Sequence, residues 1–391
     1  MKPAVPNTYA VPAPNPAPVT KLMISALCAL FFLFGMYFAT WASRIPAIRD
    51  AISLTPGTLG LVLLLRGLGS VLIMPLVAIV ISLLGARKAV ILAGAFVLIF
   101  IPPMALATGW KSLAAVLFVA GASASCFDMA INSIGAGLEK RAKRSIMSTF
   151  HAWYCVGNFG GALIGTVAAS YKVDVFLHFG VITILLAVIL AVSYRYLPKG
   201  TKVEETQPVK FSIPHGGLIW LGVIGFFGSV TENSISNWVA LFYSDHILVS
   251  DGLSPIGYTA FAAAMLIARL AGDRLKDVFG GSVLLTAGGV LTSIGLISAI
   301  LFPNIYVATI GFFAAGMGTA LIFPLLFSAA GKEGTMALTS VATLGYAGGI
   351  IAPVIMGYVV TEWQLSGGMI FVSGITFLIA IIASRARLLK Q

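Results

Sequence analysis

The sequence predicts an all-α integral membrane protein with twelve transmembrane helices in two pseudo-symmetric six-helix bundles. Its composition is the first reason, because 59% of the 391 residues are hydrophobic, only 9% are charged, and the mean hydropathy is +1.01. A soluble domain carries about 25% charged residues, so this composition excludes an ordinary soluble protein. The placement of the basic residues and an internal repeat are the other two reasons.

Long apolar runs predict the number of helices. A helix needs about 20 mainly apolar residues to cross the hydrocarbon core of a bilayer. Twelve runs meet this requirement, at residues 22–43, 56–82, 88–107, 111–137, 147–170, 175–197, 216–243, 255–273, 282–302, 305–329, 335–360 and 367–384.

The net charge of +11 predicts how the chain is oriented in the membrane. With twelve spans and a cytoplasmic N-terminus, most of the 24 Lys and Arg residues fall in cytoplasmic segments. Four of them, Arg44, Arg49, Lys111 and Lys172, fall on the opposite side. This asymmetry is the positive-inside bias of membrane proteins. The basic charge therefore indicates orientation, with both termini in the cytoplasm, and we expect no nucleic-acid partner.

A polar stretch at residues 198–214 divides the spans six and six. We predict a cytoplasmic loop there, an N-terminal bundle at residues 21–197 and a C-terminal bundle at residues 215–391. Residues 1–20 are rich in Pro and Ala with no apolar pattern, which predicts a disordered cytoplasmic tail.

Small residues recur at matching places in the two halves. Gly157, Gly160, Gly161 and Gly165 in the fifth predicted span align, at an offset of 188 residues, with Gly345, Gly348, Gly349 and Pro353 in the eleventh. Gly121 in the fourth span matches Gly316 in the tenth at a nearby offset. Small residues let helices approach closely in lipid. Two similar halves with a binding site between them near the midplane are typical of secondary transporters.

Three charged side chains, Arg66, Asp128 and Glu232, lie inside the apolar runs. A charge at bilayer depth costs about 2.5–3.5 kcal/mol on insertion scales, so it persists mainly where it pairs, faces water or handles an ion or substrate. Asp128 lies near the midplane with Asn132 on the same helical face. Because burial disfavours the ionised form of a carboxylate, we predict Asp128 as a proton carrier. The alternative is a structural ion pair with Arg66, whose guanidinium either neutralises Asp128 or binds a substrate carboxylate or hydroxyls.

The seventh predicted span carries a broad polar face. Glu232 with Ser236, and Asn233 with Asn237, recur at four-residue spacing, beside Trp238. Such a face suits a hydroxylated or otherwise polar solute, or alternatively forms a hydrogen-bonded contact between helices.

Other polar side chains complete the predicted site. His151 is a candidate for proton coupling because histidine titrates near neutrality; alternatively it bonds to the neighbouring basic loop. Tyr37 either lines a vestibule or belongs to an interfacial aromatic belt. The predicted substrate-binding residues are Arg66, Asn132, Glu232, Asn233, Asn237, Trp238 and Tyr37, and the predicted proton-coupling residues are Asp128, Glu232 and His151.

Several segments carry a resemblance to a known family. They are Phe127–Asn132 followed by Met147–Ala152, and then Glu232–Trp238, Arg269–Arg274 and Phe323–Gly331. Over residues 20–388 the chain resembles transporters of the major facilitator superfamily, and these segments resemble its YbjJ-type inner-membrane transporters, relatives of fucose permease. The resemblance implies a multi-pass protein of a bacterial inner membrane with a protonatable acid on the fourth span.

The resemblance also implies gating loops on the cytoplasmic side. The predicted gating residues are Gly85, Arg87 and Lys88 in the first half, and Arg269, Gly272, Asp273 and Arg274 in the second. In the superfamily, the loop between spans two and three usually carries an acid followed by a base. Here Ser82 and Leu83 stand at those positions, so the first of the two latches is expected to be weak.

The sequence therefore predicts a secondary transporter and not an enzyme. It has no nucleotide-binding loop of the G-x-x-x-x-G-K-[ST] kind, and Cys28, Cys126 and Cys155 lie at unrelated positions without metal-ligand spacing. We expect a monomer without cofactors, in contact with the lipid bilayer, that moves protons and a small polar or sugar-like solute. The alternative function is a proton-driven exporter of metabolites, siderophores or drugs. The absence of the Gly-Pro pair typical of drug exporters after Gly157 argues against a drug.

Overall fold

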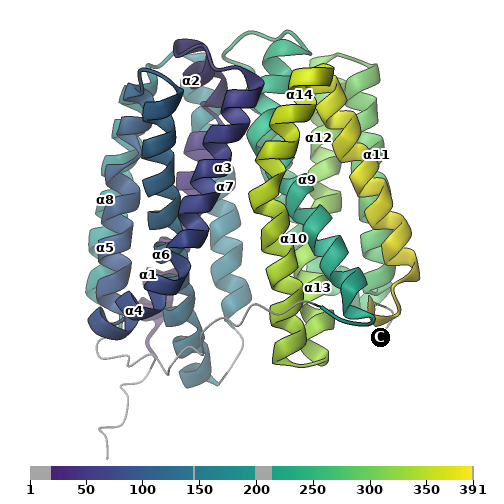
Figure 1. Cartoon of the computed structure of the whole chain (residues 1–391). Helices are drawn as coiled ribbons and strands as arrows, with labels where there is room; N and C mark the ends of the chain where they lie inside the picture. The colour runs from purple at the N-terminus through teal and green to yellow at the C-terminus, as the bar shows by residue number, and fades with distance from the viewer. Residues whose placement is uncertain (1–18, 144–145, 199–213, 390–391) are drawn as a thin grey trace, which may run out of the picture.

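The computed structural model describes residues 19–143, 146–198 and 214–389, and within these ranges every regular element is a helix. The helices run side by side and form one elongated bundle (Figure 1). The tail predicted at residues 1–20 and the loop predicted at residues 198–214 lie almost wholly outside the described residues.

The described helices divide between the two halves of the chain. The first half contains α1 (Lys21–Ala42), α2 (Ile45–Ala51), α3 (Pro56–Leu72), α4 (Met74–Leu84), α5 (Ala86–Ile99), η1 (Pro102–Leu106), α6 (Trp110–Ala142), α7 (Met147–Ser170) and α8 (Val175–Tyr196). The second half contains α9 (Leu218–Asp245), α10 (Ile256–Phe279), α11 (Gly281–Leu301), α12 (Ile305–Thr319), α13 (Ile322–Lys332), α14 (Thr335–Arg385) and η2 (Arg387–Leu389).

Among the described residues, nine helices are long and apolar enough to cross a membrane. α7 and α10, with 24 residues each, have comparable length but are not among the nine. The last of the nine, Met336–Arg385, contains non-helical backbone at Trp363 and Gln364. This interruption lies between the predicted spans at residues 335–360 and 367–384.

Proline explains two further interruptions. The predicted span at residues 56–82 is divided into α3 and α4, and Pro75 lies in the first turn of α4. The predicted span at residues 305–329 is divided into α12 and α13, and Pro324 lies in the first turn of α13. A proline ring removes one backbone donor and clashes with the preceding turn, so the helix breaks just before it.

The structure corrects the predicted position of the second gating loop. Gly272, Asp273 and Arg274 lie inside α10, which continues to its C-cap, Gly280. The backbone of Gly280 has φ = 75°, and Gly85 between α4 and α5 has φ = 78°, a region that favours glycine. Hydropathy falls where the charged residues begin, but charged residues continue a helix on its solvated side. The helix therefore ends at the glycine and not at the hydropathy boundary.

The matched small residues hold equivalent pairs of helices at close range. Gly157 on α7 faces a main-chain carbonyl of α1, and Gly348 on α14 faces one of α9. Gly121 on α6 and Gly316 on α12 do the same toward α3 and α10. A Cβ atom at any of these four positions would overlap the facing carbonyl. Matching glycines therefore hold matching pairs of helices together in both halves of the chain.

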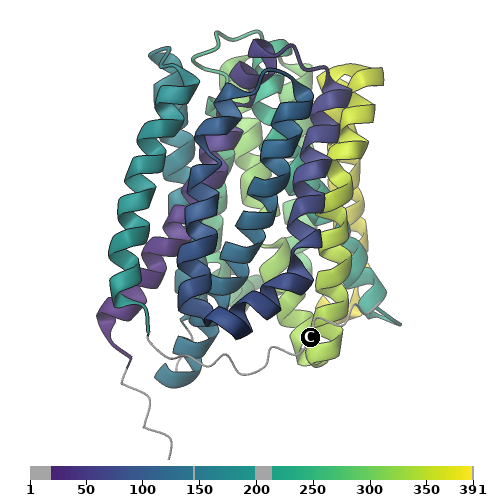
Figure 2. The same ribbon diagram turned by 60° about the vertical axis from the view of Figure 1, so that its left-hand side comes forward.

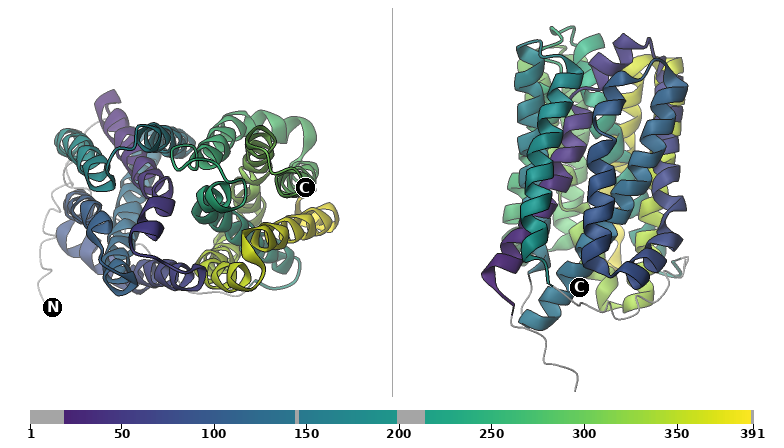
Figure 3. Two further views of the ribbon diagram at one scale, coloured as in Figure 1. Left: turned by 90° about the horizontal axis from the view of Figure 1, so that it is seen from above. Right: turned by 90° about the vertical axis from the view of Figure 1, so that its left-hand side faces the viewer.

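The two halves lie side by side and touch along two seams. Viewed from above, the helices of the first half lie on one side and those of the second half on the other (Figure 3). α3 packs against the first part of α14, and α7 packs against α10 (Figure 2). At the first seam, a Cβ atom on Gly357 would lie 3.0 Å from the Cα atom of Gly60. α2 caps one end of the bundle, which we name the α2 end, and α1 begins at the opposite, terminal end, where η2 also lies (Figure 1).

Replacement of Gly157 by valine is expected to destabilise the protein, because the added side chain would push α7 away from α1. Overpacking of this kind costs about 1–3 kcal/mol, which thermal unfolding in detergent would show as a lowered transition temperature. Gly180→Ala is the matched control, since a Cβ atom at Gly180 meets no atom within 4 Å. Equal transition temperatures for the two variants would contradict the close packing of α1 on α7.

Candidate functional site

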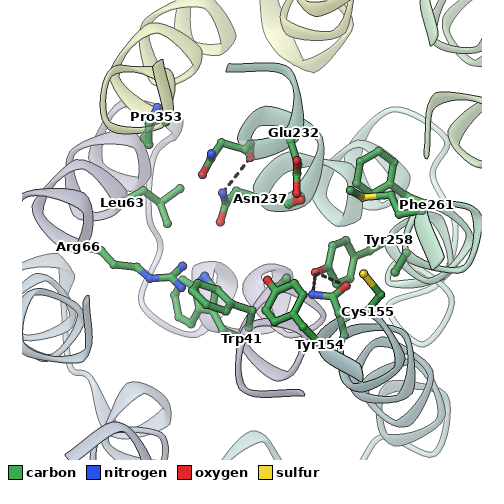
Figure 4. Close-up of a pocket in the computed structure, with 18 of the residues that line it drawn as sticks. Trp41, Leu63, Arg66, Tyr154, Cys155, Glu232, Asn237, Tyr258, Phe261 and Pro353 are labelled. Carbon is green, nitrogen blue, oxygen red and sulfur yellow. Dashed lines mark hydrogen bonds between the residues drawn. The ribbon is translucent and has the colours of Figure 1, made fainter. Parts of the chain in front are cut away.

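A cavity of about 320 Å³ lies between the two halves of the chain (Figure 4). Its walls come from α1, α3 and α7 of the first half and from α9, α10 and α14 of the second. Its charged and amide lining residues are Arg66, Asn158, Glu232, Asn233, Asn237 and Arg269, and its aromatic lining residues are Phe38, Trp41, Tyr154, Tyr258 and Phe261. Small-molecule sites typically have about 300–1,000 Å³, so the cavity suits a small ligand. We name it the Arg66 chamber.

Arg66 on α3 is a cation that forms no ion pair with any carboxylate in the described part of the chain. Its guanidinium lies over the ring of Phe38, 4.7 Å from the ring centroid, a contact that attracts a positive charge electrostatically. Among the described residues, no Asp or Glu forms an ion pair with it, and its Nη2 atom has no hydrogen-bond partner. The sequence left open whether Arg66 neutralises Asp128, and in this structure the two are not paired.

Glu232 on α9 and Arg269 on α10 form an ion pair, with 3.8 Å between Oε1 and Nη2. Arg269 also donates a hydrogen bond to the Sγ atom of Cys155 on α7, at 3.1 Å, and one to the carbonyl of Ala320, at 3.3 Å. It therefore bonds to both halves of the chain. The structure corrects its predicted position, since Arg269 lies inside α10 at the cavity wall and not in a loop.

A second cavity, of about 340 Å³, adjoins the first, and we name it the Asp128 chamber. The residues that line both chambers are Tyr154, Glu232, Asn233, Arg269 and Gly349. Asp128 on α6 and His151 on α7 line only the second. The Oδ1 atom of Asp128 accepts a hydrogen bond from Asn132 at 2.8 Å. The ion pair of Glu232 and Arg269 therefore lies where the two chambers meet.

Three of the predicted substrate-binding residues do not line either chamber. Asn132 bonds to the carboxylate of Asp128 from the same helix. Tyr37 is buried and packs edge-on against Phe38, with 5.1 Å between ring centroids. Trp238 is also buried, and it lines a separate hollow near the α2 end. Spacing along one helix places side chains on a face, but the neighbouring helices decide whether that face meets the cavity.

The first predicted gating loop links helices within one half. Arg87 at the start of α5 donates a hydrogen bond to the main-chain carbonyl of Tyr194 on α8 at 2.9 Å. Its guanidinium also lies over the aromatic ring of Tyr194, 4.3 Å from the ring centroid. Gly85 forms the turn before it, and Lys88 is exposed.

Sequence reasoning missed Asn158 and Tyr258, which join α7 to α10 beside the chamber. The Nδ2 atom of Asn158 donates a hydrogen bond to the hydroxyl of Tyr258 at 3.0 Å. A signal was present on α10, where Tyr258, Met265 and Arg269 follow helical spacing and all line the chamber. On α7, Tyr154 and Asn158 share a face in the same way.

Comparison with known proteins agrees with this architecture. A model of the Major Facilitator Superfamily matches residues 26–334. The chain belongs to the major facilitator superfamily. An uncharacterized MFS-type transporter of Yersinia pestis is 32% identical over 363 residues, which cover 91% of this chain and 93% of that protein. The transporter y4wD of Sinorhizobium fredii is 29% identical over 370 residues, which cover 93% and 97%. The membrane protein MosC of Rhizobium meliloti is 28% identical over 375 residues, which cover 93% and 90%.

Solved structures share the fold at low sequence identity. A mutant of the nucleoside transporter NupG superposes with a TM-score of 0.76 at 11% identity, covering 93% of this chain and 100% of that one. The human organic anion transporter MFSD10 superposes with a TM-score of 0.66 at 14% identity, covering 94% and 100%. This superfamily member is therefore a multi-pass membrane transporter of a small-molecule substrate, which confirms the prediction that it is not an enzyme.

At the α2 end, an ion pair and hydrogen bonds join the two halves of the chain. Arg49 on α2 forms a two-pronged ion pair with Asp245 at the end of α9, with 2.9 Å between Nη2 and Oδ1 and a second contact between Nη1 and Oδ2. Hydrogen bonds between the halves nearby join Thr166 to Thr259 at 2.9 Å and Ser170 to the carbonyl of Gly252 at 2.8 Å. The Arg66 chamber lies on the terminal side of these bonds.

Loss of the Arg49–Asp245 pair is expected to expose the Arg66 chamber more often from the α2 end. Ser236 lines that chamber, so Ser236→Cys, in a background without the native cysteines, reports access to it. An exposed ion pair is worth about 0.2–1 kcal/mol, so Arg49→Gln should raise labelling by an impermeant maleimide from one side of the membrane about twofold to fivefold.

The charge-reversed pair, Arg49→Asp with Asp245→Arg, should return the labelling rate toward its original value. Lys111→Gln removes a cation near the same end of the bundle and should leave the rate unchanged. Equal labelling of all these variants would show that the ion pair does not hold this end closed.

Proposed function

We propose that this chain is a proton-coupled secondary transporter that moves a small polar solute by alternating access. The observation that carries the proposal is the pair of adjoining chambers between the halves, one with an arginine that forms no ion pair among the described residues and the other with a partly buried aspartate. An ionisable group inside a membrane segment is by default a functional site, because its burial is costly. A site between two similar halves allows each face to open in turn.

The proposed topology has twelve transmembrane spans. α7 and α10 cross the bilayer in addition to the nine described helices that are apolar enough on their own, and α14, which is one of those nine, crosses it twice. Residues 21–197 and 215–391 then form two six-helix bundles that rock against each other. The basic residues near the terminal end, among them Arg87 and Lys88, support a cytoplasmic position for that end.

The proposed location is a bacterial inner membrane, because the similar transporters named above come from bacteria. Within the superfamily, the segment around Asp128 and Asn132 favours the branch related to fucose permease. Since Arg66 and Asp128 lie in chambers of one chain, the protein is proposed to act as a monomer.

In the proposed cycle, the solute binds in the Arg66 chamber. Arg66, Glu232, Asn233 and Asn237 line it, and they offer both donors and acceptors to a polar molecule. The closed α2 end and the chambers toward the terminal end correspond to a state in which the solute exchanges with the cytoplasm. Separation of Arg49 from Asp245 would accompany the opposite state.

Proton coupling is proposed to run through Asp128 and Arg269. Arg269 lines both chambers and is paired with Glu232, and in the proposed cycle ionised Asp128 of the second chamber would attract it as well. Protonation of Asp128 would remove that second attraction and leave Arg269 paired with Glu232 alone. In this proposal the charge of one chamber affects the binding residues of the other, and the solute does not need to contact Asp128.

Asp128→Asn is expected to abolish solute accumulation driven by a pH gradient in proteoliposomes, because an amide cannot carry the proton. One proton per solute supports about a tenfold concentration ratio per pH unit, and the variant should equilibrate its solute without accumulation. Exchange of labelled for unlabelled solute should persist, since the Arg66 chamber is intact.

Glu362→Gln is the matched control, because it removes an exposed carboxylate on α14 that lies well beyond the residues of this helix that line the chambers. It should accumulate solute as the original protein does. Undiminished accumulation by Asp128→Asn would remove proton coupling through this residue.

A further inference from the structure

The charges in the Arg66 chamber point to an anionic substrate. Two guanidinium groups, of Arg66 and Arg269, line it, with a single carboxylate, that of Glu232. Glu232 is paired with Arg269, so Arg66 is left as the uncompensated cation. A buried charge without a partner is costly, and a bound anion would relieve that cost.

Unused hydrogen-bond donors lie at the same place. The Nη2 atom of Arg66 and the indole Nε1 atom of Trp41 are buried and have no hydrogen-bond partner among the residues that the structure describes. Trp41 is only 2% exposed, and both residues line the chamber (Figure 4). An indole and a guanidinium can only donate, so they need an acceptor, and the positive charge of Arg66 favours an anionic one. A carboxylate is such a group, and it matches the planar fork of arginine.

The opposite wall offers acceptors. Asn237 uses its Nδ2 atom to donate to the carbonyl of Asn233 at 2.8 Å, and Asn233 uses its own to donate to the carbonyl of Ser229 at 3.1 Å. Their amide oxygens are left to accept hydrogen bonds from a ligand. This wall therefore suits hydroxyl groups, while the Arg66 wall suits a carboxylate.

We propose that the substrate is a hydroxylated monocarboxylate, such as a sugar acid, whose carboxylate is bound by Arg66 and Trp41 and whose hydroxyls face Asn233 and Asn237. This inference rests on the proposed transport function and names its substrate class. A single charge is favoured because one guanidinium is uncompensated. A phosphate monoester carries close to two negative charges, more than the single uncompensated positive charge of Arg66. The cavity volume corresponds to about ten water molecules at about 30 Å³ each, enough for a compact sugar acid.

The same charges define what crosses the membrane. If Asp128 takes up one proton for each monoanion bound beside Arg66, the loaded transporter gains no net charge. Transport of the acid is then electroneutral, whereas a neutral solute moved with one proton would carry a positive charge. Uptake of the acid should therefore respond to a pH gradient and not to the membrane potential.

Binding to the purified protein tests the substrate class. The probes are gluconate, galactonate and glucuronate, their neutral counterparts glucitol and glucose, and the cationic sugar glucosamine, each measured by the shift in unfolding temperature. We expect stabilisation by at least one acid and weaker or no stabilisation by the neutral and cationic sugars. Stabilisation by none of the three acids, or a larger effect of a neutral or cationic sugar, would overturn the proposal.

Variants locate the carboxylate. Arg66→Gln should weaken binding of the acid about tenfold to a hundredfold, because a hydrogen-bonded charge is lost. Trp41→Phe keeps a ring but removes the donor, and it should weaken binding about twofold to tenfold. Arg66→Lys keeps the charge without the fork and should fall between Arg66→Gln and the original protein. Arg385→Gln, which removes an exposed arginine at the end of α14, should bind the acid unchanged. Unchanged binding by Arg66→Gln would refute the role of Arg66.

Proteoliposomes separate failure of this inference from failure of the proposed function. Uptake of the acid is measured with a pH gradient alone and with a potassium diffusion potential set by valinomycin alone. Uptake that is driven by the pH gradient and does not respond to the potential supports both the proposed function and the anionic substrate. Proton-driven uptake of a neutral sugar would leave the proposed function standing and refute the anion. Binding of an acid through Arg66 without any response to the pH gradient would leave the anionic substrate standing and refute proton coupling.

Discussion

The placement of charge inside an apolar bundle is the constraint on which the rest of this structure depends. Lipid cannot solvate a guanidinium or a carboxylate, so such groups must meet water, each other or a ligand. Arg66, Asp128, Glu232 and Arg269 all line the chambers between the two halves. Arg269 further bonds to Cys155 of the opposite half, so the charged groups also take part in joining the halves.

Close packing of the helices fixes where those charges lie. Gly157 and Gly348 allow α7 to lie against α1 and α14 against α9, and these four helices all contribute to the Arg66 chamber. The two seams between the halves differ from each other. At the seam of α3 with α14, Gly60 and Gly357 bring the backbones close together, whereas at the seam of α7 with α10 hydrogen bonds such as that of Asn158 with Tyr258 join polar side chains.

The sequence predicted most of the helices because bilayer thickness imposes a length and a composition on each span. It also predicted the polar face of α9, since Glu232, Asn233 and Asn237 recur at helical spacing and line the chamber. It failed where a property depends on the neighbours. Arg269 was assigned to a gating loop through the superfamily resemblance, although it also fell within the predicted span at residues 255–273, and the structure places it inside α10.

The sequence also did not predict how each helix is rotated about its own axis. Trp238 shares its helix with Asn237, yet it faces the hollow near the α2 end, because neighbouring positions on a helix point about 100° apart. Asn158 and Tyr258 are far apart in the chain, and no local pattern links them. Only the docking of the two halves brings such residues together.

The two kinds of bond at the α2 end respond differently to the surrounding medium. The side chains of Arg49 and Asp245 are 18% and 39% exposed, so dissolved ions reach them, and at physiological ionic strength screening acts over about 8 Å. The bond between Thr166 and Thr259 involves no charge and escapes that screening. In the proposed alternating-access cycle, the balance between closed and open forms of this face would therefore depend on the salinity of the compartment it borders, while the remaining threonine contact would limit how far salt alone can shift it.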